Sequence, residues 1–497
     1  MALCVATDLR LNVRNVVISE SPLQDEWNTT HSDSANNERK EHMGQYDPRP
    51  YQLDLNEWPK IITSDVPGPT SKALHQRAAK YVKGLSGQVR LFPVVFEKGF
   101  GCTLEDADGN KYIDFSSGIY VTTLGHCHPK VSEAVAKYAH TLMNAHDFTT
   151  SVKVKLLEMM VEVLPGDLRG IQLYDSGTTA VEAGLRTCRA ATGKFEFISC
   201  YRDFHGKSGH AISLANMTKL SGAGRAQGFY MVPRPDTYRP MWTREDRSLD
   251  TEKYLEFYDD FIKNATANCV AAFVLEPIQG WAGSIMPPDD FFPKLAAFCK
   301  ERDILLFADE VLTSWGRTGK WLCTEHWGVV PDVVTIGKGF GNGFPVTAMV
   351  VREPYADAVD KISASTSYGG NPMACAAALA STEVIIEEGL LEHAMELEDL
   401  FRTKMADWTS KYRIVGDTRV RGCLMGVELV KDKTTKEPFD EAGKLVYQTA
   451  FRKGLAWIPA GHILRMSPPI VMPNEVASKA MDIIEESIAE VQRLLGY

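Results

Sequence analysis

The stretch that decides the fold is Ile304-Leu-Leu-Phe-Ala-Asp309-Glu310, followed by Val333-Val-Thr-Ile-Gly-Lys338-Gly-Phe-Gly-Asn-Gly-Phe-Pro345. Each half begins with an apolar run of strand length, and each run leads to a charged residue, an acid in the first and an amine in the second. In parallel α/β sheets, ligands bind beyond the carboxyl ends of the strands. The sequence therefore predicts that Asp309 and Lys338 reach one site.

These two residues have complementary chemistry. A lysine in a glycine-rich turn can be partly desolvated, which frees its neutral amine to form a Schiff base with an aldehyde. A buried carboxylate such as Asp309 keeps the ring nitrogen of pyridoxal phosphate protonated, so the pair indicates this cofactor. An acid after an apolar run is also typical of a nucleotide-binding Walker B strand, and on these residues alone both interpretations stay open.

Further strands and helices alternate along the chain, which predicts a mostly parallel sheet with helices on both faces. The expected strands are residues 170–175, 195–199, 228–232, 270–275, 304–308, 332–336 and 347–351. The expected helices are residues 72–82, with Ser71 as a possible cap, 131–143, 181–191 and 474–495, the last with an amphipathic pattern. The fold class is therefore α/β.

The signature around the two charged residues resembles that of a known family. The segment Asp309-Glu-Val-Leu-Thr-Ser-Trp-Gly-Arg-Thr-Gly319, then His326-Trp-Gly-Val-Val-Pro-Asp332 and Gly337-Lys338-Gly, is similar to the signature of class III (ω-amino acid type) aminotransferases. The resemblance extends from about residue 73 to the C-terminus. It implies a fold type I pyridoxal phosphate enzyme whose large domain has a mostly parallel seven-stranded sheet.

The resemblance also divides the chain. Residues 1–71 are polar and lack a periodic apolar face, so they are expected to form a mobile extension. Residues 72–125 form the N-terminal part of a small domain, residues 126–372 the large cofactor-binding domain, and residues 373–497 the C-terminal part of the small domain.

Several motifs are expected to hold the cofactor. The turn Ser176-Gly177-Thr178-Thr179 precedes a predicted helix and can offer backbone amides to a phosphate, although a purely structural turn is an equal alternative. The resemblance places Gly177 and Thr178 on the phosphate and Phe204 against the pyridine ring. It also places Ser367 on the cofactor phosphate of a neighbouring subunit, which implies a homodimer with shared active sites.

The resemblance assigns a second group of residues to the substrate. These are Ile119, Tyr120, Lys207, Glu276 and Arg465. Arg465 corresponds to an arginine that binds an α-carboxylate, and Glu276 to a glutamate that can pair with it when no carboxylate is bound. A plain buried ion pair is the alternative.

Lys207 and Leu312 depart from the family pattern. Lys207 stands where relatives acting on 4-aminobutyrate or ornithine have an arginine, and a lysine lacks the bidentate fork that grips a carboxylate. Leu312 replaces a common glutamine. Both departures favour an amino donor without a distal carboxylate, such as a diamine or an aminosugar.

Composition excludes other classes. The net charge of -10 gives no electrostatic reason to expect nucleic acid or an acidic membrane as a partner. No apolar run approaches the roughly 18 residues of a membrane span. The 10 cysteines are scattered singly and no basic leader is present, so we expect a cytoplasmic protein without a structural metal. The His126-Cys-His128 pair lacks a nearby third ligand, which leaves a metal site there the weaker alternative.

The predicted function is a pyridoxal phosphate-dependent aminotransferase with a ping-pong cycle. Lys338 is the catalytic base, an amine such as a diamine, aminosugar or ω-amino compound is the donor, and 2-oxoglutarate or pyruvate is the acceptor. The same fold also hosts aminomutases and decarboxylases, and a 4-aminobutyrate-type aminotransferase is a further alternative.

Overall fold

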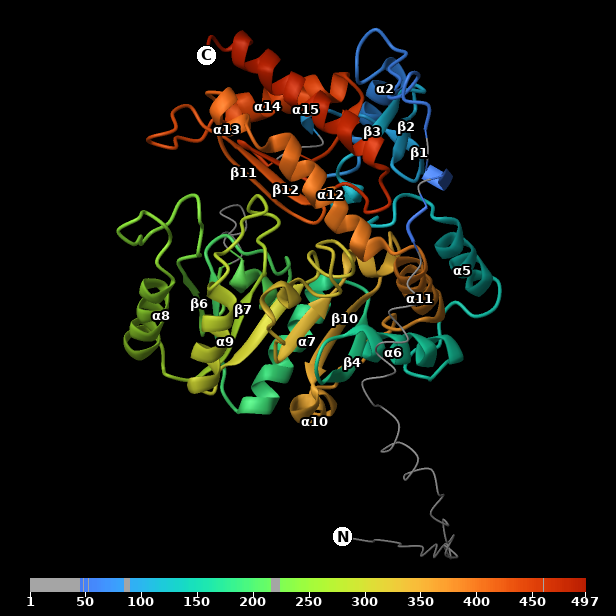
Figure 1. Ribbon diagram of the computed structural model, residues 1–497. Coiled ribbons are helices and arrows are strands. Elements are labelled where there is room, and N and C mark those ends of the chain that lie inside the picture. Colours follow the sequence, from blue (N-terminus) through green and yellow to red (C-terminus); the bar gives the residue numbers. More distant parts are fainter. Residues whose placement is uncertain (1–44, 48, 52, 85–89, 216–223, 459) are drawn as a thin grey trace, which may run out of the picture. The chain divides into compact units, whose positions relative to one another are not determined.

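The fold is built around a seven-stranded sheet (Figure 1). The computed structural model describes residues 45–497 except positions 48, 52, 85–89, 216–223 and 459. The strand order is β4-β10-β9-β8-β7-β5-β6, and β10 is antiparallel to both neighbours while the other pairs are parallel. The predicted mostly parallel seven-stranded sheet is confirmed. Its strands are Leu168–Tyr174 (β4), Glu196–Cys200 (β5), Phe229–Val232 (β6), Val270–Leu275 (β7), Leu305–Glu310 (β8), Val333–Ile336 (β9) and Thr347–Arg352 (β10).

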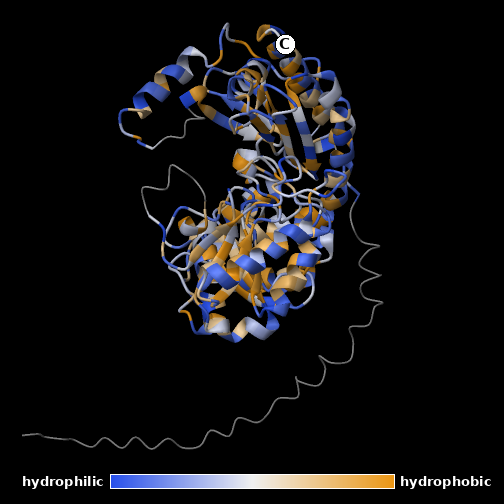
Figure 2. Cartoon of the chain, turned by 90° about the vertical axis from the view of Figure 1, so that its left-hand side faces the viewer, coloured by the Kyte–Doolittle hydropathy of each residue, from blue (hydrophilic) through white to orange (hydrophobic). Residues whose placement is uncertain are grey.

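Helices cover both faces of this sheet, which explains why its strands are apolar without a polar alternation. Phe273 of β7 is fully buried in a cluster with α8 (Thr251–Ala265) and α9 (Phe291–Glu301). Phe307 of β8 is fully buried in a second cluster with α7 (Gly177–Thr192) on the other face. Figure 2 shows the hydrophobic strands enclosed by helices with hydrophilic outer surfaces.

A group of helices packs beside the sheet at its β4 end. Helix α11 contacts both α5 and α6 through a face rich in buried alanines, which lets the helix backbones approach closely. These helices are Pro129–Ala139 (α5), Ser151–Val163 (α6), Ala356–Asp360 (α10) and Pro372–Glu387 (α11). Short 3-10 helices lie at Arg49–Tyr51 (η1), Ala211–Leu214 (η2), Cys323–Trp327 (η4), Lys338–Gly341 (η5) and Glu353–Tyr355 (η6).

The N-terminal and C-terminal parts of the described chain form two smaller sheets. One is Phe96–Phe100 (β1), Thr103–Asp106 (β2), Lys111–Asp114 (β3) and Leu455–Ala456 (β13), and the other is Val415–Arg421 (β11), Leu424–Leu429 (β12) and Ile463–Met466 (β14). Because β13 pairs in parallel with β3, the N-terminal and C-terminal pieces share one sheet. The boundaries after residues 125 and 372 stay predictions.

The C-terminal pieces are covered by helices Leu390–Met405 (α12), Trp408–Lys411 (α13), Asp440–Arg452 (α14) and Asn474–Leu494 (α15). Helix α15 agrees with the predicted amphipathic helix to within one residue. It buries Val476 and Ile484 along one face. Among the described residues, no helix has the length and apolar character needed to cross a membrane.

The predicted extension, residues 1–71, is wrong in its C-terminal part. Residues 1–44 lie outside the described residues, but Tyr51 and Trp58 are buried in the main core, and the hydroxyl of Tyr46 donates to the carbonyl of Val471 at 2.7 Å. The segment is mostly polar, so its composition did not indicate that a few aromatic residues attach it to the core.

The first long helix also starts earlier than predicted. Helix α2 (Pro69–Ala78) begins with a proline, whose fixed φ suits a first helical position. The carboxylate of Asp108 accepts the backbone N–H groups of Thr70 and Ser71 at 2.7 and 2.8 Å. Asp108, from a distant turn, therefore does the capping that was predicted for Ser71.

Candidate active site

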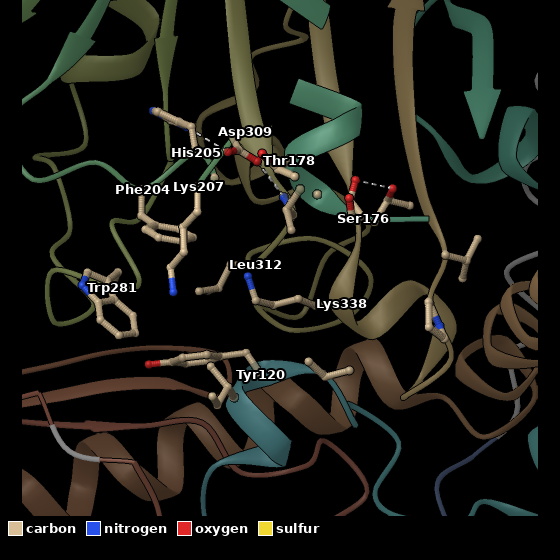
Figure 3. A pocket seen from close by; sticks show the side chains of 18 of the residues that line it. Tyr120, Ser176, Thr178, Phe204, His205, Lys207, Trp281, Asp309, Leu312 and Lys338 are labelled. Atoms are coloured by element: carbon tan, nitrogen blue, oxygen red, sulfur yellow. Dashed lines mark hydrogen bonds and ion pairs between the residues drawn. The ribbon is translucent and has the colours of Figure 1, made fainter. Parts of the chain in front are cut away.

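A cavity of about 590 Å³ lies at the carboxyl ends of the central strands (Figure 3). All of the predicted site residues except Ser367 line it: Ile119, Tyr120, Gly177, Thr178, Phe204, Lys207, Glu276, Asp309, Lys338 and Arg465. The cavity is lined by residues of the large sheet, by Arg465 of β14 and by Tyr120 of the short helix α4 (Ser117–Tyr120). The size suits a cofactor with a small substrate.

Lys338 reaches this cavity from the turn after β9. It has a φ of 44°, and Gly337 before it packs so closely that an added Cβ would lie 2.9 Å from Thr347. Removal from water lowers the pKa of the Lys338 amine, and the carboxylates of Asp309 and Glu276 only partly oppose this effect. A lowered pKa makes the neutral, nucleophilic amine more available.

Asp309 lies in β8 and is held by three hydrogen bonds. Its Oδ1 accepts from the Thr335 hydroxyl at 2.7 Å and from the Val311 backbone at 3.2 Å, and its Oδ2 lies 2.8 Å from Nδ1 of His205. Burial alone would raise the pKa of Asp309, but the hydrogen bonds from His205 and Thr335 lower it below its ordinary value. The carboxylate therefore stays ionised, as a partner for a protonated ring nitrogen must.

His205 follows Phe204 directly in the sequence but was not predicted as a site residue. Its ring lies between Asp309 and Asp203, whose Oδ2 is 3.5 Å from Nε2. Burial would lower the pKa of His205, yet the two carboxylates raise it to about 10, so the ring is a buried cation. Its position between the predicted residues Phe204 and Lys207 was the available signal, but Asp203 is recognised only once the fold places it.

The start of α7 forms a cradle suited to an anion. Ser176 caps the helix by accepting the Thr179 N–H, so α7 begins at Gly177 and not at residue 181 as predicted. Gly177 and Thr178, at the start of this 16-residue helix, line the cavity, and Figure 3 shows Thr178 beside it. The first N–H groups of a helix have no intrahelical partner and attract anions. Gly206 has a φ of 137°, and a Cβ there would lie 2.3 Å from Thr178 Oγ1, so only glycine fits beside this cradle.

Phe204 supplies an aromatic wall. Its ring lies 5.8 Å from that of Trp281, a second cavity residue that was not predicted. The Phe204 backbone N–H donates to Oε1 of Glu276 at 2.9 Å, which fixes the ring relative to the cavity. A flat heteroaromatic ring can stack on such a face.

Ile119 and Tyr120 form the opposite side of the cavity. Both have positive φ values, 69° and 66°, in the short helix α4. Tyr120 is buried, and its hydroxyl has no hydrogen-bond partner among the described residues. It is therefore available to a bound molecule.

Glu276 and Arg465 do not form the ion pair that the sequence suggested. Glu276 accepts the backbone N–H groups of Phe204 and Gly280, at 2.9 and 3.0 Å. Burial and the neighbouring Asp203 raise the pKa of Glu276 to about 8, so it is mostly neutral near pH 7. Because Glu276 is mostly neutral and is bonded to backbone N–H groups, it offers Arg465 no negative charge.

Other sequence predictions fall outside the cavity. Ser367 lies on an exposed loop, where its carbonyl accepts from the Asn144 side chain at 3.0 Å. His126 and His128 bond to different carboxylates, Asp114 at 2.8 Å and Glu388 at 3.2 Å. Within the described ranges, no three acidic, histidine or cysteine side chains are grouped to hold a metal ion.

The residues fit pyridoxal phosphate part by part. Lys338 matches its aldehyde, Asp309 its ring nitrogen, Phe204 its ring and the start of α7 its phosphate. On a mostly parallel seven-stranded sheet, this arrangement is that of a fold type I pyridoxal phosphate enzyme.

Comparison with known proteins identifies the family. The model of the family "Aminotransferase class-III" matches residues 85–488. The chain is 33% identical over 463 residues to an alanine/serine racemase of Pyrococcus horikoshii, covering 90% of this chain and 96% of that one. It is 32% identical to a probable 4-aminobutyrate aminotransferase of Bacillus subtilis, over 84% of this chain and 98% of that one. The crystal structure of a transaminase from the marine bacterium Virgibacillus is similar with a TM-score of 0.78 and 27% identity, over 85% of this chain and all of that one.

The chain therefore belongs to the class III aminotransferases, and it is a pyridoxal phosphate-dependent transaminase. The roles assigned to individual site residues stay predictions.

The raised pKa of Glu276 predicts a pH-dependent effect of Glu276→Gln on the cofactor-free protein. The folded state holds this proton up to about pH 8, whereas the unfolded chain releases it near the ordinary value of 4.5. Wild-type stability from this group is therefore complete below pH 4.5 and declines as the pH rises to 8. Glutamine stays neutral at every pH. As the pH rises, the free energy of unfolding of the variant should therefore increase relative to that of wild type by up to about 1.4 kcal/mol per pH unit.

Urea unfolding of the cofactor-free protein between about pH 5 and pH 8 measures this difference. The exposed Glu301→Gln is the control and should give no such slope. A constant difference between Glu276→Gln and wild type across this range would show that Glu276 is already ionised.

Proposed function

We propose that this transaminase moves an amino group from a primary amine to a 2-oxo acid such as 2-oxoglutarate or pyruvate in a ping-pong cycle. The observation that carries the proposal is the meeting of Lys338 and the ionised Asp309 in one cavity. A ping-pong cycle needs a single site that both substrates occupy in turn, and the cavity provides one.

Pyridoxal phosphate, when bound, supplies the aldehyde that takes up the amino group and the ring that accepts electrons from the substrate carbon. Lys338 removes a proton from that carbon and then delivers it to a different atom. Its lowered pKa favours the first of these steps. Asp309, kept ionised by His205, holds the ring nitrogen in its protonated form. Tyr120 and Phe204 bound the reacting region and limit the entry of water.

The charges in the cavity narrow the donor. Lys207 projects into the cavity, with its Nζ 6.0 Å from the Phe204 ring centroid (Figure 3), and no carboxylate of the described residues forms an ion pair with it. A second ammonium, as in a diamine, would be repelled by Lys207 and by Arg465. Lys207 therefore favours a neutral or anionic group on the donor, although the sequence departure alone favoured a diamine or an aminosugar.

Racemisation of an amino acid is a second candidate reaction at the same site. The observation in its favour is the similarity to the alanine/serine racemase. A racemase must exchange a proton on both faces of the substrate carbon, which requires a second proton carrier besides Lys338. Lys207 and Tyr120 are the ionisable cavity residues able to serve on the substrate side.

The active unit is proposed to be a homodimer in which Ser367 reaches the partner's cofactor phosphate. The loop that contains Ser367 is hydrogen-bonded to Asn144, and exposed apolar side chains near these two residues in the sequence would suit burial against a second copy. They are Leu142, Met143, Phe148 and Tyr368, of which Phe148 is 81% exposed. The described cysteines form no disulfide, which supports a cytoplasmic location.

The loaded enzyme should lose its visible absorbance when mixed with an amino donor and regain it with a 2-oxo acid. A panel of L-amino acids, ω-amino acids, diamines and aminosugars identifies the donor, and mass spectrometry identifies the oxo product. Chiral chromatography without any oxo acid tests the second candidate. Formation of the D-enantiomer without oxo product would replace transamination by racemisation, and carbon dioxide release would replace it by decarboxylation.

Complementation tests the shared site. The Lys338→Ala and Ser367→Glu variants should each be inactive, the second because its carboxylate repels a phosphate. If Ser367 serves the partner's site, unfolding and refolding the two chains together should restore about a quarter of wild-type activity, since half of the dimers are mixed and each has one intact site. No recovery, or a monomer in sedimentation, would contradict the shared site.

A further inference from the structure

Arg465 is a buried cation that forms no ion pair with any of the described residues. It lies in β14, is 2% exposed and lines the cavity. Its Nε and Nη2 atoms are buried and have no hydrogen-bond partner among the described residues. Because a buried guanidinium with unmade hydrogen bonds is unfavourable, this side chain points to an anionic ligand.

Two aromatic rings hold this guanidinium. The Arg465 Cζ lies 4.6 Å from the Trp281 ring centroid and 5.3 Å from that of Tyr120, both within cation–π range. Such contacts attract the cation without consuming its N–H groups, so the donors remain free for a ligand. Trp281 and Tyr120 both border the cavity in Figure 3.

The loop that carries Trp281 is anchored at both ends. Before Trp281, the Gly280 N–H donates to Glu276 at 3.0 Å. After it, the guanidinium of Arg419 donates to the carbonyls of Gly283 and Ser284 at 2.8 to 3.0 Å. These hydrogen bonds hold the Trp281 loop in place, so the Trp281 ring has a fixed position against Arg465.

An acid could also have held Arg465, but its effect would be different. A carboxylate partner such as Glu276 would neutralise the guanidinium and occupy its donors, and the pair would then tolerate a substrate without a carboxylate. Here Glu276 is engaged by backbone N–H groups and is mostly neutral near pH 7. The rings leave the Arg465 charge without a carboxylate partner. A substrate that places an apolar group against Arg465 would therefore bury this charge unpaired, which is unfavourable.

We propose that Trp281, with Tyr120, is a positioning residue that holds Arg465 in the cavity as a fixed carboxylate receptor, so that the amino donor and the oxo acceptor both carry a carboxylate. This inference rests on the proposed transamination and narrows its donor to amino acids. The name of the racemase relative, which specifies alanine and serine, agrees with this class.

The test compares Trp281→Leu, which fills the space without an aromatic face, with Trp281→Phe, which keeps one. Butyrate is the binding probe, because it carries a carboxylate but no amino or oxo group and cannot react. Calorimetry on the cofactor-loaded protein should show about tenfold weaker binding of butyrate to Trp281→Leu, and less than about threefold weaker binding to Trp281→Phe.

Kinetics with a matched pair of donors separates positioning from folding. 2-Aminobutyrate and propylamine differ only by the carboxylate. Trp281→Leu should raise KM for 2-aminobutyrate about tenfold with kcat nearly unchanged, while turnover of propylamine stays the same or increases. Equal butyrate binding by Trp281→Leu and wild type would overturn the proposal, and so would a parallel loss of kcat with both donors.

Failure of this inference is distinguishable from failure of the proposed function. If wild type transaminates propylamine as readily as 2-aminobutyrate, the function stands and the carboxylate receptor falls. If wild type binds butyrate more tightly than Trp281→Leu does but transfers no amino group from any donor, the receptor stands and the transamination falls.

Discussion

The parallel pairing of β8 with β9 is the constraint on which the site depends. Their register sets Asp309 opposite Thr335, and the Thr335 hydroxyl donates to the Asp309 carboxylate at 2.7 Å. Lys338 follows three residues after Thr335, so the same register also brings the amine to the edge where the acid lies. One ladder of backbone hydrogen bonds thus fixes the two groups that a pyridoxal phosphate enzyme needs most.

The buried acids of the cavity differ in their charge state. Asp309 stays ionised because the cationic His205 lies 2.8 Å away, whereas burial, together with the nearby Asp203, raises the pKa of Glu276 to about 8. Similar carboxyl groups therefore take different tasks according to their neighbours. The neutral state of Glu276 is also what leaves Arg465 without a counter-charge and gives the aromatic rings their role.

Much of the fold could be predicted because it depends on local patterns. The seven strands of the large sheet follow from short apolar runs, and Asp309 and Lys338 follow from the residues at the ends of two of them. Errors occurred where a distant partner decides the structure. Asp108 caps α2 from another turn, and a few aromatics, Tyr51 and Trp58 among them, bind a polar segment to the core.

The site shows the same limit. The family resemblance named residues that line the cavity, apart from Ser367, but it also implied a pair between Arg465 and Glu276. Only the three-dimensional arrangement shows that Trp281 and Tyr120 contact Arg465. Trp281 stands one residue after Gly280 in a loop and has no charge or periodicity that would have marked it.

The central claim, that Lys338 is the amine that binds the cofactor, is tested most directly by borohydride reduction of the loaded protein followed by peptide mass analysis. Two lysines, Lys338 and Lys207, project into the cavity, so the measurement has a built-in competitor. The account predicts that the reduced cofactor is attached to the peptide containing Lys338 and is lost in Lys338→Ala but retained in Lys207→Ala. Attachment to Lys207, or no attachment at all, would contradict it.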